Sequence, residues 1–150
     1  MSITAIDPDL RKSGVCTLDE NGEIVLLKSM SIVELVEYTK ANKSNIYAIE
    51  NVNKVGAMYN NRKNASQRIG AKIAQDVGKV KATGTLIAQL IEAATGREPM
   101  LAPLGLGKQV KNNSKLFNEL SGWKGRSNED MRDAWAIARW VWVTGQTTKL

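Results

Sequence analysis

Residues 3–14 of the chain read ITAIDPDLRKSG, a short apolar run that ends in two closely spaced acids. The run from Ile3 to Ile6 has the composition of a buried strand, and Asp7, Pro8 and Asp9 follow it directly. Because the protein carries a formal net charge of +6, two acids at the end of a buried strand are unexpected. Two interpretations are open at this point: Asp7 caps a turn, or the strand carries a carboxylate that has a function.

Outward from this stretch, similar patterns predict five strands and four helices. Apolar runs bounded by turn residues favour strands, and apolar residues spaced three and four apart favour helices. The predicted strands are Ile3–Asp7, Ser13–Leu18, Glu23–Leu27, Asn45–Glu50 and Pro99–Leu106. The predicted helices are Ser31–Ala41, Asn64–Thr95, Lys108–Leu120 and Ser127–Val143. This order predicts a mixed α/β fold in one domain, residues 1–150, with helices flanking one sheet.

Three local signals support these boundaries. The Asn-Gly pair at 21–22 is a strong signal for a tight hairpin between the second and third strands. Ser31 stands three residues before Glu34, which is the spacing of a helix-capping box. Ser127 stands three residues before Asp130, so we expect Ser127 to cap the last helix.

The composition narrows the class of protein and the kind of site. With 43% hydrophobic and 24% charged residues the chain has an ordinary soluble composition, and no apolar run approaches the roughly 18 residues of a membrane span. No secretory signal is recognisable and Cys16 is the single cysteine, so we expect a cytoplasmic location. The absence of histidine excludes a Ser-His-Asp triad and a histidine zinc site. Any metal site must therefore use oxygen ligands, which favours Mg²⁺ or Mn²⁺.

Positive charge is concentrated in the middle of the chain. Residues 51–126 carry thirteen basic residues against four acidic ones, whereas residues 1–50 carry five against eight. This middle segment is either a solvated basic surface or the binding site of a phosphate backbone, and charge alone leaves both interpretations open.

Four acids stand where predicted strands end or where the last helix begins. Asp7 ends the first strand and Glu50 ends the fourth. Asp130 and Asp133 are three residues apart, so both project from one face of the last helix. That face continues as an apolar stripe of Ala134, Ile137 and Val141. Carboxylates beside a buried face are unfavourable unless they are paired with bases or bind a cation.

Each acid also has a purely structural interpretation. Asp130 then serves as the capping-box partner of Ser127, and Asp133 pairs with Arg132 or Arg139. Jointly, four acids in a chain without histidine match a two-metal phosphoryl-transfer site, in which carboxylates hold two ions about 3.5–4 Å apart. A basic middle segment would then hold an anionic substrate.

Five stretches, taken in order, resemble the RuvC-type Holliday-junction resolvases of the ribonuclease H-like superfamily. IDPDLRKSG (6–14) resembles their IDPGxxxTG opening, YAIE (47–50) their second acidic strand, and DMRDAWAIA (130–138) their closing DxxDAxAxA helix. NASQRIGAKIAQDVGKV (64–80) is similar to their NA...LG.ARGV helix, and GLGKQVKNNSK (105–115) to their GxG...K segment. The resemblance spans nearly the whole chain and implies a ribonuclease H-like mixed five-stranded sheet flanked by helices.

Carried over residue by residue, the resemblance implies a site and its cofactor. The catalytic, metal-binding acids that it implies are Asp7, Glu50, Asp130 and Asp133. Two Mg²⁺ ions are the implied cofactor, and Mn²⁺ is expected to support activity as well. Lys111 falls where the family has a lysine close to its active site, and its alternative interpretation is a solvated helix face.

The resemblance also implies partners. These are branched DNA, above all the four-way junction, and a second copy of the chain, because two symmetric nicks require two active sites. The long helix around Ile69–Ile91 is the candidate dimer interface. Tyr59 is either a stacking face for a base or a packed loop anchor. The basic residues expected to contact phosphates are Arg62, Lys63, Arg68, Lys72, Lys108 and Lys115.

Three departures from the family pattern affect the implied function. Asp9 stands in place of a glycine, Asn53 stands in place of an aromatic residue, and the basic turn Trp123–Arg126 has no counterpart. The implied function is a metal-dependent endonuclease that resolves four-way junctions by paired nicks. The departures leave open a more relaxed branched-DNA endonuclease and a junction-binding protein with little cleavage. A sugar-kinase-like ATPase is disfavoured, because no nucleotide-binding glycine motif is recognisable.

Overall fold

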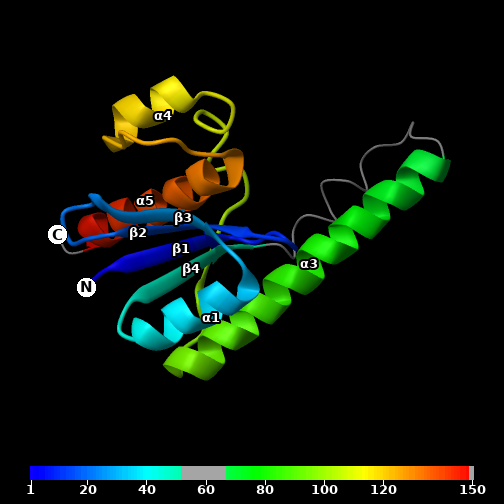
Figure 1. Ribbon diagram of the computed structural model, residues 1–150, viewed down its shortest axis with the longest axis horizontal. Helices are drawn as coiled ribbons and strands as arrows, with labels where there is room; N and C mark the ends of the chain where they lie inside the picture. Colours follow the sequence, from blue (N-terminus) through cyan, green and yellow to red (C-terminus); the bar gives the residue numbers. More distant parts are fainter. Residues whose placement is uncertain (52–66, 149–150) are drawn as a thin grey trace.

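The computed structural model describes residues 1–51 and 67–148, and in them one five-stranded sheet is covered by helices on both faces (Figure 1). The strands lie in the order β3-β2-β1-β4-β5. Their bounds are Ile3–Asp7 for β1, Ser13–Leu18 for β2, Ile24–Met30 for β3, Ile46–Glu50 for β4 and Met100–Ala102 for β5. β1 and β3 pair antiparallel with β2, whereas β4 runs parallel to both β1 and β5. The predicted mixed α/β class is confirmed.

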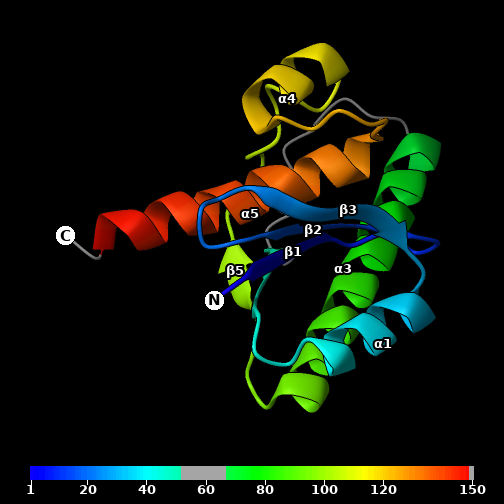
Figure 2. The same cartoon turned by 60° about the vertical axis from the view of Figure 1, so that its left-hand side comes forward.

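The helices form two layers. α1 and α3 lie against one face of the sheet, α5 lies against the other, and α4 lies beyond α5 (Figures 1 and 2). Their bounds are Ile32–Ala41 for α1, Gln67–Thr95 for α3, Ser114–Ser121 for α4 and Glu129–Thr148 for α5. The amino-terminal part of α3 extends past the edge of the sheet (Figure 1). No helix in the described part of the chain is both long and apolar enough to cross a membrane.

Each face of the sheet has its own apolar core, because β1 and β2 are buried on both sides. The α5 side is built around Phe117 and Trp135, whose rings meet edge to face with centroids 5.3 Å apart. The α1 and α3 side is built around Ile6, Ile87 and Ile91. Burial of hydrophobic side chains on both faces stabilises the sheet and fixes the positions of the strand ends.

The single cysteine is part of the core on the α5 side. Cys16 lies in β2 with none of its surface exposed, and burial raises the pKa of its thiol. The thiol is therefore held in its neutral form and is inaccessible in the folded protein.

Two of the local signals are confirmed and one is wrong. The hairpin between β2 and β3 turns at Gly22, whose φ of 78° is the left-handed conformation that glycine adopts readily. Ser31 caps α1, and its hydroxyl accepts a 3.2 Å hydrogen bond from the backbone N–H of Glu34. Ser127 does not cap α5. The Asn128 side chain does so, by accepting a 2.9 Å hydrogen bond from the backbone N–H of Met131.

The segment between β5 and α4 also differs from its prediction. β5 ends at Ala102 rather than continuing to Leu106, and the helix predicted from Lys108 begins only at Ser114. Backbone hydrogen bonds instead form a series of turns, in which Gly107 accepts from both Val110 and Lys111. Lys111 therefore lies in a turn and not on an exposed helix face.

Candidate active site

Two of the four acids lie side by side at one edge of the sheet, at the carboxyl ends of two neighbouring parallel strands. Asp7 is the last residue of β1 and Glu50 is the last residue of β4. Because these strands are parallel and Ile6 is in register with Ile49, their carboxyl ends meet at the same edge. Asp7 is only 9% exposed. The resulting pair of carboxylates comes from two neighbouring inner strands of the sheet.

The start of α5 brings the other two acids to the same edge. A close approach between α5 and β2 makes this possible, because a Cβ built on Gly14 would overlap the backbone carbonyl of Asp130. Gly14 is also the residue paired with Asp7 across the antiparallel β1–β2 ladder. A side chain at position 14 would hold α5 away from the sheet, so this glycine sets the position of Asp130 relative to Asp7.

A second glycine makes the corresponding contact with the other helical acid. A Cβ on Gly107 would overlap the Asp133 carboxylate. Glycine at this position lets the turns after β5 pass directly over the acid. The same turns reach the strand acid, since the backbone N–H of Gly105 donates a hydrogen bond to Glu50. The turns between β5 and α4 therefore contact acids from two different elements.

The turns also deliver one lysine to the acids. The Lys111 Nζ lies 3.5 Å from an Asp133 carboxylate oxygen, with side-chain exposures of 48% and 20%. The sequence offered Arg132 or Arg139 as the partner of Asp133, and the partner is Lys111. Attraction to Asp133 is the largest cause of a raised pKa of Lys111, so its amine is held in the charged form.

Arg132 has a different role from the one that the sequence suggested. Its guanidinium is buried and donates hydrogen bonds of 2.9 and 2.7 Å to the backbone carbonyl of Lys111. It also donates to the carbonyl and the hydroxyl of Ser127, at 2.8 and 2.9 Å. Among the described residues Arg132 forms no ion pair with a carboxylate. It therefore fastens the turn that carries Lys111 to the helix that carries Asp133.

Sequence reasoning missed the contacts that assemble these acids. Gly14 and Gly107 were recognised only as parts of the family motifs, with no structural role assigned to them. Arg132 was considered only as an ion-pair partner for Asp133. Their contacts join residues far apart in the chain, from 21 positions for Arg132 and Lys111 to 116 for Gly14 and Asp130. No local pattern could have found them.

The four acids share one electrostatic property: the pKa of each is raised, and desolvation by burial is the largest cause for all of them. The effect is strongest at Asp7, where burial and repulsion from the other three acids raise the pKa to about 9. Asp7 and Asp130 share a side-chain hydrogen bond, which raises the pKa of Asp7 and lowers that of Asp130. Without a bound cation, the negative charge of the four acids is only partly balanced by nearby positive charge.

The chemistry of this cluster fits a divalent, oxygen-seeking ion. Carboxylate oxygens are ligands that Mg²⁺ prefers, and a cation would remove the repulsion that raises these pKa values. No group of three or more acidic or cysteine side chains in the described residues forms a ready metal-binding cage.

The residues expected to bind DNA are only partly described. Tyr59, Arg62 and Lys63 lie outside the described residues, and of Arg68 only the backbone, in α3, is described. The others have exposed side chains. Lys72 lies on α3 with its Nζ 4.0 Å from Asp76, Lys108 lies beside Gly105, and Lys115 lies in the first turn of α4.

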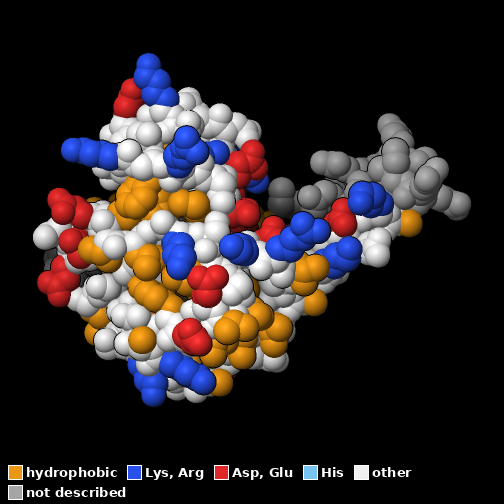
Figure 3. Space-filling view, viewed as in Figure 1, with side chains coloured by type: hydrophobic (Ala, Val, Ile, Leu, Met, Phe, Trp, Pro, Cys, Tyr) orange, Lys and Arg blue, Asp and Glu red, His pale blue; other side chains and the backbone are white. Residues whose placement is uncertain are grey.

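On the surface, acidic side chains gather near the start of α5, where α3 passes the edge of the sheet (Figure 3). Basic side chains lie on both sides of them, along α3 and over α4 (Figure 3). A chain with a net positive charge thus surrounds an acidic centre with cations.

No known family profile and no curated protein matches this sequence. Solved structures do match its fold. Thermus thermophilus RuvC in complex with Holliday junction substrate aligns with a TM-score of 0.58 at 12% sequence identity, over 99% of this chain and 98% of that chain. Another T. thermophilus RuvC structure aligns with a TM-score of 0.53 at 15% identity, with the same coverage. With its sheet order β3-β2-β1-β4-β5 and helices on both faces, the chain therefore has the ribonuclease H-like α/β fold and is similar to RuvC over nearly its whole length.

Proposed function

We propose that this protein is a divalent-metal-dependent endonuclease that cuts branched DNA, with the four-way junction as its main substrate. The observation that carries the proposal is the carboxylate cluster at the edge of the sheet, in which β1, β4 and α5 hold four acids together despite their mutual repulsion. The RuvC-like fold supports the choice of substrate. The cations on both sides of the cluster supply the surface that a polyanion needs (Figure 3).

In this proposal the four acids bind two Mg²⁺ ions, or Mn²⁺, and those ions supply Lewis-acid stabilisation of the phosphodiester and activation of a water. Asp7 lies at the centre of the cluster and has the most strongly raised pKa, so it gains most from a bound cation. Lys111 is paired with Asp133 and brings a fixed positive charge to the place where the phosphate would lie. Arg132 positions Lys111 through the backbone carbonyl of that residue.

We propose further that two copies of the chain act together, because paired symmetric nicks require two active sites. Ile87 and Ile91 of α3 are each 1% exposed and belong to the core, so this part of the predicted interface faces inward. Val80 and Leu86 remain 37% and 45% exposed on the same helix. These outward residues, and not the whole apolar stripe, are the candidate contacts between the two copies.

A nicking assay tests the proposal. Labelled four-way, three-way and linear duplex DNA are incubated with the protein and Mg²⁺, Mn²⁺ or EDTA, and the products are mapped on each strand. Symmetric nicks on opposite strands of the four-way junction, dependent on the metal ion, are the expected result. Equal cutting of three-way and four-way DNA would favour the relaxed nuclease instead. Tight junction binding without metal-dependent cutting would overturn the nuclease proposal and favour a binding protein.

The assignment of the acids has its own control. Asp133→Asn should abolish nicking and leave junction binding in place, because it removes a metal ligand without adding bulk. Glu37→Gln serves as the matched variant, since Glu37 is an exposed acid on α1, away from the cluster. If the two variants nick equally well, the four acids are not the active site.

A further inference from the structure

The turn between α4 and α5, residues 122–126, is a rigid surface element that the proposed chemistry does not use. α4 is capped at its carboxyl end by Gly122, which has the left-handed conformation with a φ of 75°. The Trp123 backbone N–H donates to the Ser121 hydroxyl at 3.1 Å, and its indole N–H donates to the carbonyl of Arg126, also at 3.1 Å. The ring packs on Gly125 and on the core. Trp123 thus closes the turn from inside, and both its backbone N–H and its indole N–H are already used as donors.

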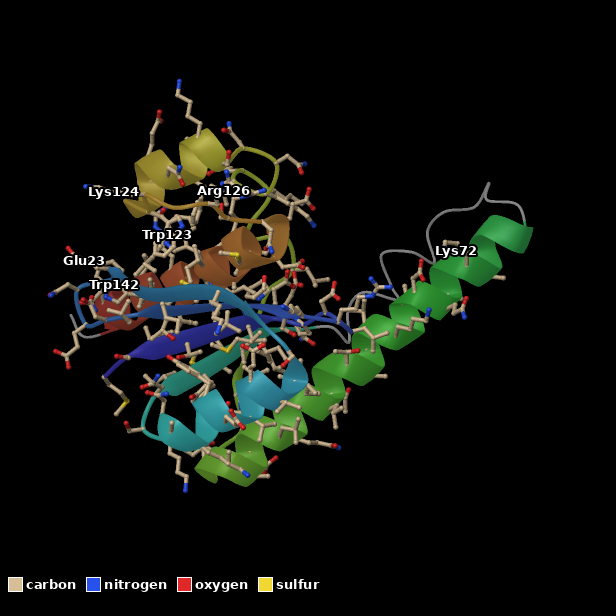
Figure 4. All side chains as sticks on the ribbon, viewed as in Figure 1. Glu23, Lys72, Trp123, Lys124, Arg126 and Trp142 are labelled. Atoms are coloured by element: carbon tan, nitrogen blue, oxygen red, sulfur yellow. The ribbon has the colours of Figure 1, made fainter. Side chains whose placement is uncertain are left out.

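This construction leaves two cations on the outside of the turn. Lys124 and Arg126 are both exposed, and neither forms an ion pair within the described part of the chain. In Figure 4 Trp123 lies between α4 and the layers below it, whereas Lys124 lies at the outer end of the turn. Because the turn is held in shape by its own hydrogen bonds, these cations can bind an anion with little further ordering of the backbone.

The far end of the turn is fixed to the acidic cluster. Ser127 accepts two hydrogen bonds from Arg132, and Asn128 caps α5 while donating a 2.9 Å hydrogen bond to the Ser29 hydroxyl of β3. Asp130 follows two residues later. The turn is therefore attached to the element that carries two of the four acids, and Arg126 lies between Lys124 and the start of that element (Figure 4).

In Figure 4 the turn lies on one side of the start of α5, and Lys72 lies on the other side, on the part of α3 that extends past the sheet. A DNA backbone that is cut at the acids must continue in both directions away from the cut. Basic residues on only one side of the acids would bind the DNA backbone on only one side of the cut. Glu23 lines a cleft with Trp123 and limits the basic surface on the side of the β2–β3 hairpin.

We propose that Lys124 and Arg126 bind the phosphate backbone of a DNA arm on the α4 side of the cut. This inference rests on the proposed function, since it places the substrate of that same site. These contacts would position the DNA without recognising its sequence, because the phosphate backbone is chemically the same at every base. Each phosphate contact should contribute about one unit to the dependence of log affinity on log salt.

The test measures binding to a four-way junction in EDTA, where no cutting can occur, between about 50 and 200 mM salt. The protein with Lys124→Ala and Arg126→Ala is compared with wild type and with a Lys40→Ala, Lys43→Ala double variant. The control also loses two positive charges, but from the end of α1 and the loop after it. α1 lies on the other face of the sheet (Figure 1). The slope should fall by about two units for the turn variant and by much less for the control.

Each outcome has a distinct meaning. Equal changes in slope for the two double variants would show that only net charge matters and would overturn the inference. An unchanged slope in the turn variant would overturn it too, while metal-dependent nicking by wild type would leave the proposed function intact. If the wild type itself neither binds nor nicks the junction, the proposed function fails and this inference fails with it.

Discussion

The two ends of β1 place buried polar groups in opposite situations. Near its start, the Thr4 hydroxyl is fully buried, lies 2.8 Å from the Thr17 hydroxyl and accepts a 3.0 Å hydrogen bond from the Asn45 amide. The network continues from Thr17 to the Tyr38 hydroxyl at 2.7 Å. At the other end of the strand, Asp7 is almost as deeply buried, among acids that repel it.

The contrast distinguishes buried polar groups that are satisfied by hydrogen bonds within the chain from buried acids whose charge must be balanced by a cation from outside the chain. A neutral network whose members satisfy one another stabilises a core. A cluster of buried acids with too little positive charge destabilises it until a cation arrives. Three residues along a single strand therefore separate a structural site from a candidate catalytic one.

The largest expected effect comes from removing the acid at the centre of the cluster. If the proposed function holds, Asp7→Asn should lower the rate of metal-dependent nicking by roughly 10³-fold or more, because an amide cannot replace the charged carboxylate that is proposed to bind the metal ions. Single-turnover nicking of a four-way junction measures this, with junction binding in EDTA as the control. A rate within ten-fold of wild type would show that Asp7, like Thr4, has only a structural role.

The next largest effect concerns the positioning of Lys111. Arg132→Ala should lower the nicking rate by about 10- to 100-fold, as expected for a group that orients a site residue through another contact. It should also destabilise the fold by about 2–3 kcal/mol, because it leaves buried carbonyls without donors.

Arg132→Lys separates these two effects. A lysine keeps the charge and can reach one carbonyl, so it should restore most of the stability but only part of the rate, with KM little changed. Thermal unfolding and the nicking rate, measured in parallel, distinguish the outcomes. Full recovery of the rate with lysine would mean that the two-pronged contact to Lys111 has no role in positioning.

The acid cluster should also give the metal-free protein an unusual dependence on pH. The Asp7 carboxyl ionises near its ordinary value of 3.8 when the chain is unfolded, and its pKa is raised to about 9 in the fold. Between these values the folded state binds more protons than the unfolded state, so stability falls as pH rises. We expect the melting temperature in EDTA to be lower at pH 8 than at pH 5.

Two comparisons sharpen this prediction. About 10 mM Mg²⁺ should remove most of the decrease at pH 8, because bound cations favour the ionised acids. Asp7→Asn should stabilise the metal-free protein at pH 8 by about 1–3 kcal/mol, since an amide is neutral in both states and folding no longer requires the uptake of a proton at position 7. Melting curves in EDTA that do not change with pH would show that the cluster is already compensated.

The smallest expected effect is at the start of β1. Thr4→Val keeps the shape of the side chain but leaves Thr17 and Asn45 each with one hydrogen-bond partner fewer, which should destabilise the fold by about 1–2 kcal/mol. The nicking rate at a temperature well below unfolding should match wild type. A large loss of nicking here would contradict the division of β1 into a structural end and a catalytic end.

The sequence predicted what depends on local pattern. The apolar runs of β1 and β4 located Asp7 and Glu50 at strand ends, and the Ser31 capping box located the start of α1. The resemblance anticipated a lysine near the acids, and Lys111 is paired with Asp133. All of these signals lie within a few residues of the feature that they indicate.

The errors have a common physical origin in tertiary contacts. A strand was predicted to Leu106 and a helix from Lys108, yet Gly105, with a φ of 79°, and Gly107 form turns that contact Glu50 and Asp133. Ser127 and Asn128 are equally good caps by residue type, and Asn128 is used while Ser127 accepts hydrogen bonds from Arg132. Long-range partners decided both cases.

The buried thiol of Cys16 makes this protein ready for site-specific labelling. Because the only cysteine is enclosed and its pKa is raised, thiol-reactive dyes should leave the folded wild-type chain unmodified. A cysteine introduced at an exposed position, such as Lys124, would then be the single reactive site without further engineering. A dye at that position and a second dye on one DNA arm would report directly, by energy transfer, on which arm of a junction passes over α4.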